Sequence, residues 1–248
     1  MKRALITAGA SGIGLAMAQA FERAGYEVHV TDIDAAALGN CPAHWGRHQA
    51  DVTDEVQMAD VIGATGTPDV LCANAGIAGP TALVEDIALS DWRRCVSVNL
   101  EGAFLAASKA VPEMKAAGRG AIIFTSSTAG IYGYPNRAPY AAAKWAVIGL
   151  MKTLAMELGP FGIRVNAICP GSVEGDRMEG VLAREAAIKG MTRDEVYAGY
   201  AGGTSMRRFV TAEEIGDMAV FLGSDAARSV SGQVIAVDGH TENPDPKL

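Results

Sequence analysis

Residues 3–32, with the sequence RALITAGASGIGLAMAQAFERAGYEVHVTD, decide the fold. The short apolar runs at 3–7 and 27–31 are typical of buried strands, and the stretch 13–24 between them has the apolar spacing of a helix. A strand, a helix and a second strand within roughly 30 residues predict a parallel βαβ unit.

The same alternation continues along the rest of the chain. Continuous apolar strands joined by helices predict an α/β protein with one Rossmann-type, doubly wound parallel sheet of about seven strands and helices on both faces. No repeat, low-complexity segment or linker divides residues 1–248, so we expect a single domain. The further strands are predicted at 46–50, 69–72, 120–125, 162–168 and 233–237, and the further helices near 54–63, 90–116, 139–158 and 211–223.

The composition excludes several classes of protein. With 248 residues, 49% hydrophobic and 20% charged, the chain can bury a sizeable core. The net charge of −7 argues against nucleic acid or an anionic membrane surface as a partner. No apolar run approaches the ~18 residues of a membrane-spanning helix, and the first apolar stretch is too short for a signal peptide. We therefore expect a cytoplasmic protein.

The cysteines do not predict a metal site. None forms a Cys-x-x-Cys pair, so in a reducing compartment the four are expected to be buried as small hydrophobic residues. Cys41, His44 and His48 have metal-like spacing, but Pro42 and Gly46 interrupt any helix there and a fourth ligand is missing. A polar loop leading into a strand is the favoured interpretation, and no metal is predicted.

Glycines mark the turn between the first strand and the first helix. Doubly wound sheets bind ligands beyond the carboxyl ends of their strands, where the strand order reverses. Glycines at this turn let the backbone approach a pyrophosphate, and the helix N-terminus supplies free N–H groups. A simple tight turn would also use glycine, but the position in a βαβ unit favours a dinucleotide. The expected phosphate contacts are Gly9, Ser11, Gly12, Ile13 and Gly14.

Polar or small residues follow the other strands as well. Asp32 comes after the second strand, where a carboxylate accepts both ribose hydroxyls of an adenosine and repels a 2′-phosphate, which favours NAD. Asp34 fits an exposed loop position instead. Each of the remaining candidates could also be an ordinary turn residue. The further expected cofactor contacts are Asp51, Val52, Asn74, Ala75, Gly76, Pro170, Gly171 and Val173.

Tyr140 and Lys144 lie four residues apart with three alanines between them, on one face of a predicted helix. Alanines favour the helix and leave room for another molecule alongside. The pair could also sit at the edge of an amphipathic helix. Ser126 and Ser127, after the fifth strand, are either turn residues or hydroxyls that bind a substrate oxygen.

Together these residues resemble the classical short-chain dehydrogenases/reductases over nearly the whole chain. Singly most of the motifs are weak, but their order and spacing together are specific. In the family the serine precedes the tyrosine by 13 residues, which selects Ser127 over Ser126. The matching motifs are Thr7…Gly12-Ile13-Gly14, Asn74-Ala75-Gly76, Asn99 in VNLEG, Ser127, Tyr140-x-x-x-Lys144, Pro170-Gly171 and SGQVIAVDG at 231–239.

The resemblance implies a catalytic tetrad of Asn99, Ser127, Tyr140 and Lys144. Tyr140 would be the acid/base, and Ser127 would hold the substrate oxygen. A free tyrosine has a pKa near 10, and a unit positive charge ~4 Å away stabilises a phenolate by about 4 kcal/mol at an effective dielectric of 20. Lys144 would supply that charge and bind the nicotinamide ribose beside Tyr140, while Asn99 would hold a water on a proton path.

Two positions depart from the family pattern. Ala8 replaces a glycine that usually follows the threonine, so we expect a reshaped turn. Gly175 replaces a threonine that often contacts the nicotinamide carboxamide, so carboxamide binding is expected to depend on backbone near Val173.

The resemblance implies one dinucleotide-binding catalytic domain that transfers a hydride between a secondary alcohol and NAD. The first alternative is a 3-oxoacyl-thioester (acyl-carrier-protein) reductase. Asp32 argues against this alternative, and so does Ser11, which stands where a basic residue would be expected. The second is a non-catalytic dinucleotide-sensing protein, which would not need a charge-tuned tyrosine.

The substrate is expected to be small and polar, with a sugar or polyol favoured, and to be oxidised physiologically. The segment 171–209 is the predicted substrate lid, and its six acidic and six basic residues suit a long apolar substrate poorly. These charges could instead face solvent. Hydrogen-bonding groups precede Tyr140 at Tyr132, Tyr134, Asn136 and Arg137. An anionic substrate group could bind Arg177, Arg193, Arg207 or Arg208.

We also expect a homotetramer. The helices near 90–116 and 139–158 carry more apolar surface than one sheet face needs, and in the family the equivalent helices pair across a dimer while the last strand supports a second interface. The apolar residues concerned are Phe104, Leu105, Trp145, Leu150 and Met151.

Overall fold

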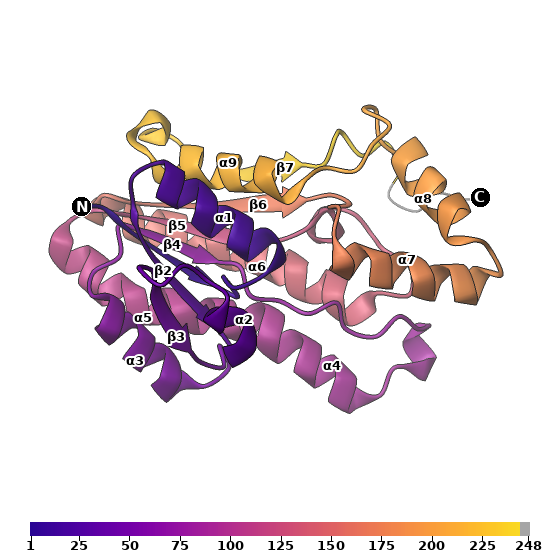
Figure 1. Ribbon diagram of the computed structural model, residues 1–248, viewed down its shortest axis with the longest axis horizontal. Helices are drawn as coiled ribbons and strands as arrows, with labels where there is room; N and C mark the ends of the chain where they lie inside the picture. The colour runs from indigo at the N-terminus through magenta and orange to yellow at the C-terminus, as the bar shows by residue number, and fades with distance from the viewer. Residues whose placement is uncertain (244–248) are drawn as a thin grey trace.

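The computed structural model describes residues 1–243, apart from the side chain of Arg177. Its centre is a seven-stranded sheet in the order β3-β2-β1-β4-β5-β6-β7, with every neighbouring pair parallel (Figure 1). This confirms the predicted doubly wound α/β fold, and each strand lies within two residues of its expected position. The strands are β1 Arg3–Thr7, β2 Glu27–Asp32, β3 Gly46–Gln49, β4 Val70–Ala73, β5 Gly120–Thr125, β6 Ile163–Pro170 and β7 Val234–Val237.

Helices cover both faces of the sheet (Figure 1). Successive strand residues point to opposite faces, so Leu5 packs with α3, α5 and α6, whereas Ile6 packs with α1 and α9. The α-helices are α1 Gly12–Arg23, α2 Ala35–Gly39, α3 Glu55–Thr65, α4 Leu89–Val96, α5 Gly102–Ala117, α6 Ala138–Leu158, α7 Asp176–Lys189, α8 Arg193–Gly202 and α9 Ala212–Gly223. Short 3₁₀ turns occupy η1 Val84–Asp86, η3 Thr128–Gly130, η4 Gly159–Phe161 and η5 Asp225–Ala227.

The predicted helix at 90–116 contains an irregularity that the sequence did not indicate. Between α4 and α5 the chain forms a π-helical turn, η2 Ser97–Glu101, and the three segments run on without a break. A π turn adds one residue to a helical turn and is common at functional sites. It contains Asn99, which is 1% exposed.

The strand order reverses between β1 and β4, and two side chains hold the carboxyl ends of these strands together. The Thr7 hydroxyl accepts hydrogen bonds from the backbone N–H groups of Asn74 (2.9 Å) and Ala75 (3.0 Å). The Asn74 amide donates back to the Thr7 carbonyl at 3.1 Å. Hydrogen bonds therefore join the two sides of the crevice expected at this reversal.

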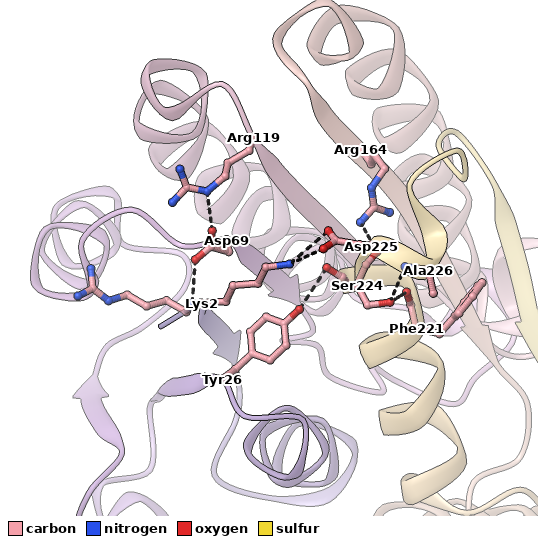
Figure 2. A network of polar contacts seen from close by, with 11 residues as sticks. Lys2, Tyr26, Asp69, Arg119, Arg164, Phe221, Ser224, Asp225 and Ala226 are labelled. Atoms are coloured by element: carbon pink, nitrogen blue, oxygen red, sulfur yellow. Dashed lines mark hydrogen bonds and ion pairs between the residues drawn. The ribbon is translucent and has the colours of Figure 1, made fainter.

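A network of polar contacts lies at the amino ends of the strands (Figure 2). Arg164 of β6 donates to the carbonyls of Leu222 (2.6 Å) and Ser224 (3.2 Å), and Lys2 pairs with Asp225 at 3.1 Å. The Tyr26 hydroxyl donates to the Gly223 carbonyl. These contacts hold the end of α9 and η5 to the sheet edge opposite the crevice.

The predicted lid segment folds as a helical pair. Helices α7 and α8 lie beyond the carboxyl ends of β6 and β7, at the right of Figure 1. They enclose a small apolar cluster of their own, and neither helix was predicted from the sequence. The buried members of that cluster are Leu182, Ala186, Val196, Ala201 and Phe209.

All four cysteines are buried, as expected, and none is disulfide-bonded. The Cys41 thiol donates to the Ala37 carbonyl, His44 pairs with Glu22, and His48 contacts His29 at 3.1 Å. Across residues 1–243, no three His, Cys, Asp or Glu side chains gather in a way that could hold a metal ion.

Among the described helices, none has both the length and the apolar character needed to cross a bilayer.

Candidate active site

A cleft of about 460 Å³ opens at the carboxyl edge of the sheet. Its walls come from the loops after β1, β4, β5 and β6, from the start of α6, and from α7 and α8. The predicted residues that line it are Ser11, Gly12, Ile13, Gly14, Asn74, Gly76, Ser127, Tyr140, Lys144, Pro170, Gly171 and Val173.

The start of α1 presents uncapped backbone to this cleft. Ser11 is the N-cap residue but makes no capping hydrogen bond with its side chain. Gly12 has a φ of +52° and no atom within 4 Å of the place where a Cβ would stand, so its surface faces open space. Free N–H groups and the helix dipole at this end suit an anion such as a pyrophosphate.

The other two glycines of the loop serve close packing. A Cβ on Gly14 would stand 1.9 Å from the Ala8 carbonyl oxygen and 2.8 Å from the Asn74 side-chain nitrogen. A Cβ on Gly9 would stand 2.6 Å from Val30. These glycines bring the loop onto the sheet, and Gly9 itself does not line the cleft.

Ala8 has a φ of 50°, in the left-handed region that favours glycine. The departure from the family pattern is thus accommodated by an alanine in a strained backbone conformation.

The carboxylate of Asp32 lies beside this loop. One oxygen accepts from the Ala10 N–H and the other from the Asp34 N–H, both at 3.2 Å. Asp34 is exposed, as expected, and also caps α2 by accepting from Ala36 and Ala37.

Several predicted cofactor residues shape the walls without lining the cleft. The Asp51 carboxylate accepts from the N–H and hydroxyl of Thr53, Val52 packs against Gly102, and the Ala75 N–H is bound by Thr7. The predicted residues outside the cleft lining are Gly9, Asp32, Asp51, Val52, Ala75 and Asn99.

Three of the four predicted tetrad residues meet at the cleft. Tyr140 and Lys144 lie on successive turns of α6, and the Lys144 Nζ is 5.7 Å from the centroid of the Tyr140 ring. Lys144 is 2% exposed, and its ammonium donates to the Thr125 carbonyl at 2.8 Å. Ser127 begins the turn after β5, and its hydroxyl accepts from the Ala129 N–H.

The two neighbouring serines have different surroundings. The Ser126 hydroxyl is buried and donates to the Lys144 backbone carbonyl at 2.8 Å. A Cβ on Gly130 would stand 2.3 Å from that hydroxyl, so glycine is needed for this close approach to α6. Ser126 therefore fixes the helix, and Ser127 is less enclosed.

The Asn99 side chain lies close to the Lys144 ammonium, next to Gly76. Its amide nitrogen donates to the carbonyls of Cys95 (2.8 Å) and Ile77 (3.0 Å), and its buried Oδ1 has no hydrogen-bond partner within residues 1–243. A Cβ on Gly76 would stand 2.6 Å from that oxygen and 3.3 Å from the Lys144 Nζ. Asn99 and Lys144 thus converge under Gly76.

The backbone of Val173 faces the cleft at its other end. Residues 173 and 210 form a parallel bridge in which the N–H of Val210 binds the carbonyl of Ser172 and the N–H of Glu174 binds the carbonyl of Val210. This pattern directs the N–H and carbonyl of Val173 away from Val210. Gly175, with a φ of +132°, is the N-cap residue of α7 and also lines the cleft.

The lid presents an apolar wall to the cleft, which the sequence did not reveal. Its cleft-lining side chains include Met178, Val181 and Tyr200. Tyr200 donates to Glu185 at 2.6 Å, and burial raises its pKa, so the hydroxyl stays protonated at neutral pH. The sequence could not locate these three residues because the fold of the lid could not be derived from it.

The charged side chains of the lid divide between the cleft and the solvent: Glu174 and Asp176 line the cleft, whereas Arg193, Arg207 and Arg208 lie outside its lining. Arg193 pairs with Glu179 and Asp194, and Arg208 pairs with Glu214 at the start of α9. Arg207 pairs with Glu242 at 3.7 Å. These side chains satisfy one another at exposed positions, because solvated pairs cost less there than charges against an apolar cleft. The side chain of Arg177 lies outside the described residues.

Of the polar residues expected before Tyr140, two line the cleft. Tyr134 and Arg137 do so, whereas the Tyr132 hydroxyl donates to the Thr241 carbonyl and Asn136 lies outside the lining. Burial raises the pKa of Tyr134, which stays protonated.

Comparison with known proteins identifies the family. The family model described as enoyl-(acyl carrier protein) reductase matches residues 7–240. The chain is 40% identical to trans-4-hydroxycyclohexanecarboxylate dehydrogenase of Sinomonas cyclohexanicum, over 96% of this chain and 92% of that protein. It is 36% identical to the 3-oxoacyl-[acyl-carrier-protein] reductase of Thermotoga maritima, over 96% of both chains.

A solved structure agrees with these relatives. NAD⁺-bound xylitol dehydrogenase superposes with a TM-score of 0.91 at 30% identity, over 96% of this chain and 98% of that chain. The chain therefore belongs to the short-chain dehydrogenase/reductase family and is an oxidoreductase of that family.

The strained alanine gives a test of the loop geometry. Ala8→Gly is expected to stabilise the ligand-free protein by about 0.5–1 kcal/mol, because relief of ~1–2 kcal/mol of left-handed strain exceeds the added entropy of the unfolded chain. Urea unfolding would measure the change. Ala10→Gly is the matched control and should lose stability, since Ala10 has no positive φ. A less stable Ala8→Gly protein would contradict the assignment of strain.

Proposed function

We propose that the protein is an NAD(H)-dependent dehydrogenase that transfers a hydride between a small polar secondary alcohol and the nicotinamide. The observation that carries the proposal is the meeting of Ser127, Tyr140 and the buried ammonium of Lys144 at one cleft. The uncapped N-terminus of α1 faces the same cleft, so one cavity offers both an anion site and a set of groups suited to proton transfer.

The residues around the cleft fit a nicotinamide dinucleotide. Gly12 and its neighbours would hold the pyrophosphate, Asp32 the adenosine ribose, Lys144 and Tyr140 the nicotinamide ribose, and the backbone of Val173 the carboxamide. Open space over Gly12 supports this assignment, as does the bridge between residues 173 and 210, which leaves the N–H and carbonyl of Val173 directed away from Val210. The bound cofactor supplies a carbon that accepts or returns the hydride.

Side chains of the protein would then transfer the proton of the alcohol. Tyr140 would remove the proton of the alcohol during oxidation, and Ser127 would hold the same oxygen in place. The Lys144 ammonium would favour the phenolate by its charge. Asn99, with its buried Oδ1 next to the Lys144 Nζ, would hold a water that passes the proton outward.

Two other functions are less well supported. Similarity to a 3-oxoacyl-[acyl-carrier-protein] reductase leaves a reductase acting on thioesters as the second candidate, and the Asp32 carboxylate argues against the NADPH that biosynthetic reductases generally use. A non-catalytic dinucleotide sensor would not need an ammonium buried beside a tyrosine, since burying a charge is costly.

Tyr140→Phe tests the chemistry. The variant keeps the ring but has no proton to exchange, so we expect less than about 1% of the wild-type kcat with NADH binding retained. Steady-state rates and NADH fluorescence titration would measure both. Tyr26→Phe, which loses a hydroxyl at the opposite edge of the sheet, should keep full activity. A Tyr140→Phe enzyme with substantial turnover would exclude Tyr140 as the acid/base.

Asp32 tests the choice of cofactor. We expect kcat/KM to be higher with NAD than with NADP, because the carboxylate would repel a 2′-phosphate. Asp32→Ala should narrow this difference in kcat/KM, because the variant would bind NAD more weakly and would no longer repel the 2′-phosphate of NADP. Asp34→Ala is the matched control: it removes the cap of α2 and should leave the cofactor ratio unchanged. Equal kcat/KM values for both cofactors in the wild type would refute this assignment.

We also propose a homotetramer. The exposed apolar side chains on α5 and α6 support an interface there, with Phe104 and Trp145 each 51% exposed. Met151, which we expected on that surface, is fully buried in the core instead because its position on α6 faces the sheet.

Light scattering should give the mass of four chains, and Phe104→Glu should reduce it by placing a charge in the interface. Val56→Glu, at an exposed apolar position on α3, is the control that should keep the tetramer. A wild-type particle with the mass of one chain would rule the tetramer out.

A further inference from the structure

We propose that Arg137 selects the substrate by binding a carboxylate, and that the substrate is a compact hydroxy acid. The inference rests on the proposed function, because it places the carboxylate next to Tyr140 as the acid/base. It goes further by assigning a charge, a binding residue and a shape to the substrate.

The position of Arg137 puts its charge beside the reacting group. Arg137 is the N-cap residue of α6, three residues before Tyr140, and its guanidinium carbon is 4.9 Å from the centroid of the Tyr140 ring. Arg137 also lines the cleft. A substrate oxygen held at the Tyr140 hydroxyl would therefore leave the rest of a short substrate near this guanidinium.

The guanidinium of Arg137 has a donor that the described residues do not satisfy. Its Nη2 donates to the Ala78 carbonyl at 3.2 Å, while its buried Nε has no hydrogen-bond partner among the described residues. No carboxylate in residues 1–243 forms an ion pair with it. An arginine edge presents two parallel N–H groups that match the two oxygens of a carboxylate.

Three arginines of the lid are arranged differently. Arg193, Arg207 and Arg208 all pair with acidic side chains of the protein itself. The other cation of the cleft, Lys144, is buried and bound to the Thr125 carbonyl. Of the cationic side chains described in the cleft, Arg137 is thus the one placed to receive an anion from outside the protein.

The loop before α6 holds Arg137 in position. Asn136 has a φ of 61°, and its carbonyl accepts from the Ala82 N–H at 3.0 Å, while Arg137 itself is bound to Ala78. The segment 78–82 therefore anchors two successive residues of the loop. A strained backbone held from outside is typical of a preorganised binding group.

The acidic side chains that line the cleft are exposed to solvent. Glu174 and Asp176 line it from the segment after β6 and are exposed, so solvent screens their charges. Glu185 lies outside the cleft lining, where its carboxylate accepts from the Tyr200 hydroxyl and pairs with Lys189, both at 2.6 Å.

The body of the substrate would meet the apolar wall of the lid. Met178 and Val181 of α7 line the cleft together with the ring of Tyr200, and a polyol would leave its hydroxyls without partners against them. A short aliphatic or alicyclic body fits such a wall, and a carboxylate at one end fits Arg137. A hydroxy acid a few carbons long combines the two.

The test compares acids with neutral compounds of the same shape. The pairs are 4-hydroxycyclohexanecarboxylate with its carboxamide, and 3-hydroxybutyrate with its carboxamide, each assayed with NAD. We expect the wild type to have a kcat/KM at least about 30-fold higher for the acids, since a desolvated charge pair discriminates to this degree. Arg137→Gln should remove that preference, mainly through KM, and change the carboxamide rates less than about threefold. Arg137→Lys should restore part of it.

Arg193→Gln is the matched control, because it removes a lid arginine that the protein already pairs, and it should leave the preference intact. A second measurement does not depend on turnover: calorimetric binding of cyclohexanecarboxylate and its carboxamide to the NADH complex. The acid should bind the wild type more tightly than the amide, and this difference should vanish in Arg137→Gln.

The outcomes separate the inference from the proposed function. If the wild type oxidises neutral alcohols with no preference for acids, the inference fails and the proposed function stands. If it turns over no alcohol, the proposed function fails, and equal binding of acid and amide would then overturn the inference as well. If Arg137→Gln slows acids and amides equally and shifts the pH profile for both, Arg137 acts on Tyr140 and not on a carboxylate, which also overturns the inference.

Discussion

The hydrogen bond from the buried Lys144 ammonium to the Thr125 carbonyl is the interaction on which the rest of the site depends. A charge that is 2% exposed is tolerated only where polar groups surround it. The Thr125 carbonyl at the end of β5 can reach the Lys144 ammonium because the Ser126 hydroxyl holds the α6 backbone close to that strand. Gly130 allows this approach because a side chain there would collide with Ser126 and with the backbone of α6. The Asn99 side chain and the Lys144 Nζ both lie close to another glycine, Gly76. The close approach of α6 to β5 therefore gives this cation a polar partner.

The sequence predicted the parts of this arrangement that depend on local chemistry. Strand positions followed from continuous apolar runs, because both faces of a parallel sheet are buried, as Leu5 and Ile6 illustrate. Cleft residues followed because the carboxyl ends of parallel strands meet at one edge, so Ser11 after β1 and Ser127 after β5 had to lie near each other. The choice of Ser127 over Ser126 needed the family spacing, since both are small polar residues after the same strand.

The sequence could not predict features that depend on tertiary packing. The π turn that contains Asn99 has no characteristic residue composition. The Asn99 side-chain amide also contacts Ile77, which is distant in the chain. The sequence of the two lid helices mixes charged residues with frequent glycines, so its apolar residues show no clear helical period. The two helices are stabilised by packing around a separate apolar cluster that includes Phe209. For this reason the count of lid charges did not show which side chains would meet the substrate: Glu174 and Asp176 line the cleft, but so do the apolar Met178 and Val181.

Backbone strain occurs at both ends of the cleft. Ala8, with a φ of 50°, stands where the phosphate loop turns, and Asn136, with a φ of 61°, stands just before α6. Each is held by groups from another part of the chain: the Ala8 carbonyl lies against Gly14 and the Asn74 amide, and the Asn136 carbonyl binds Ala82. A residue persists in such a conformation only where its surroundings fix it. The loop after β4, which contains Asn74, Gly76, Ala78 and Ala82, supplies these restraints at both ends, so this single segment aligns the expected cofactor half of the cleft with the substrate half.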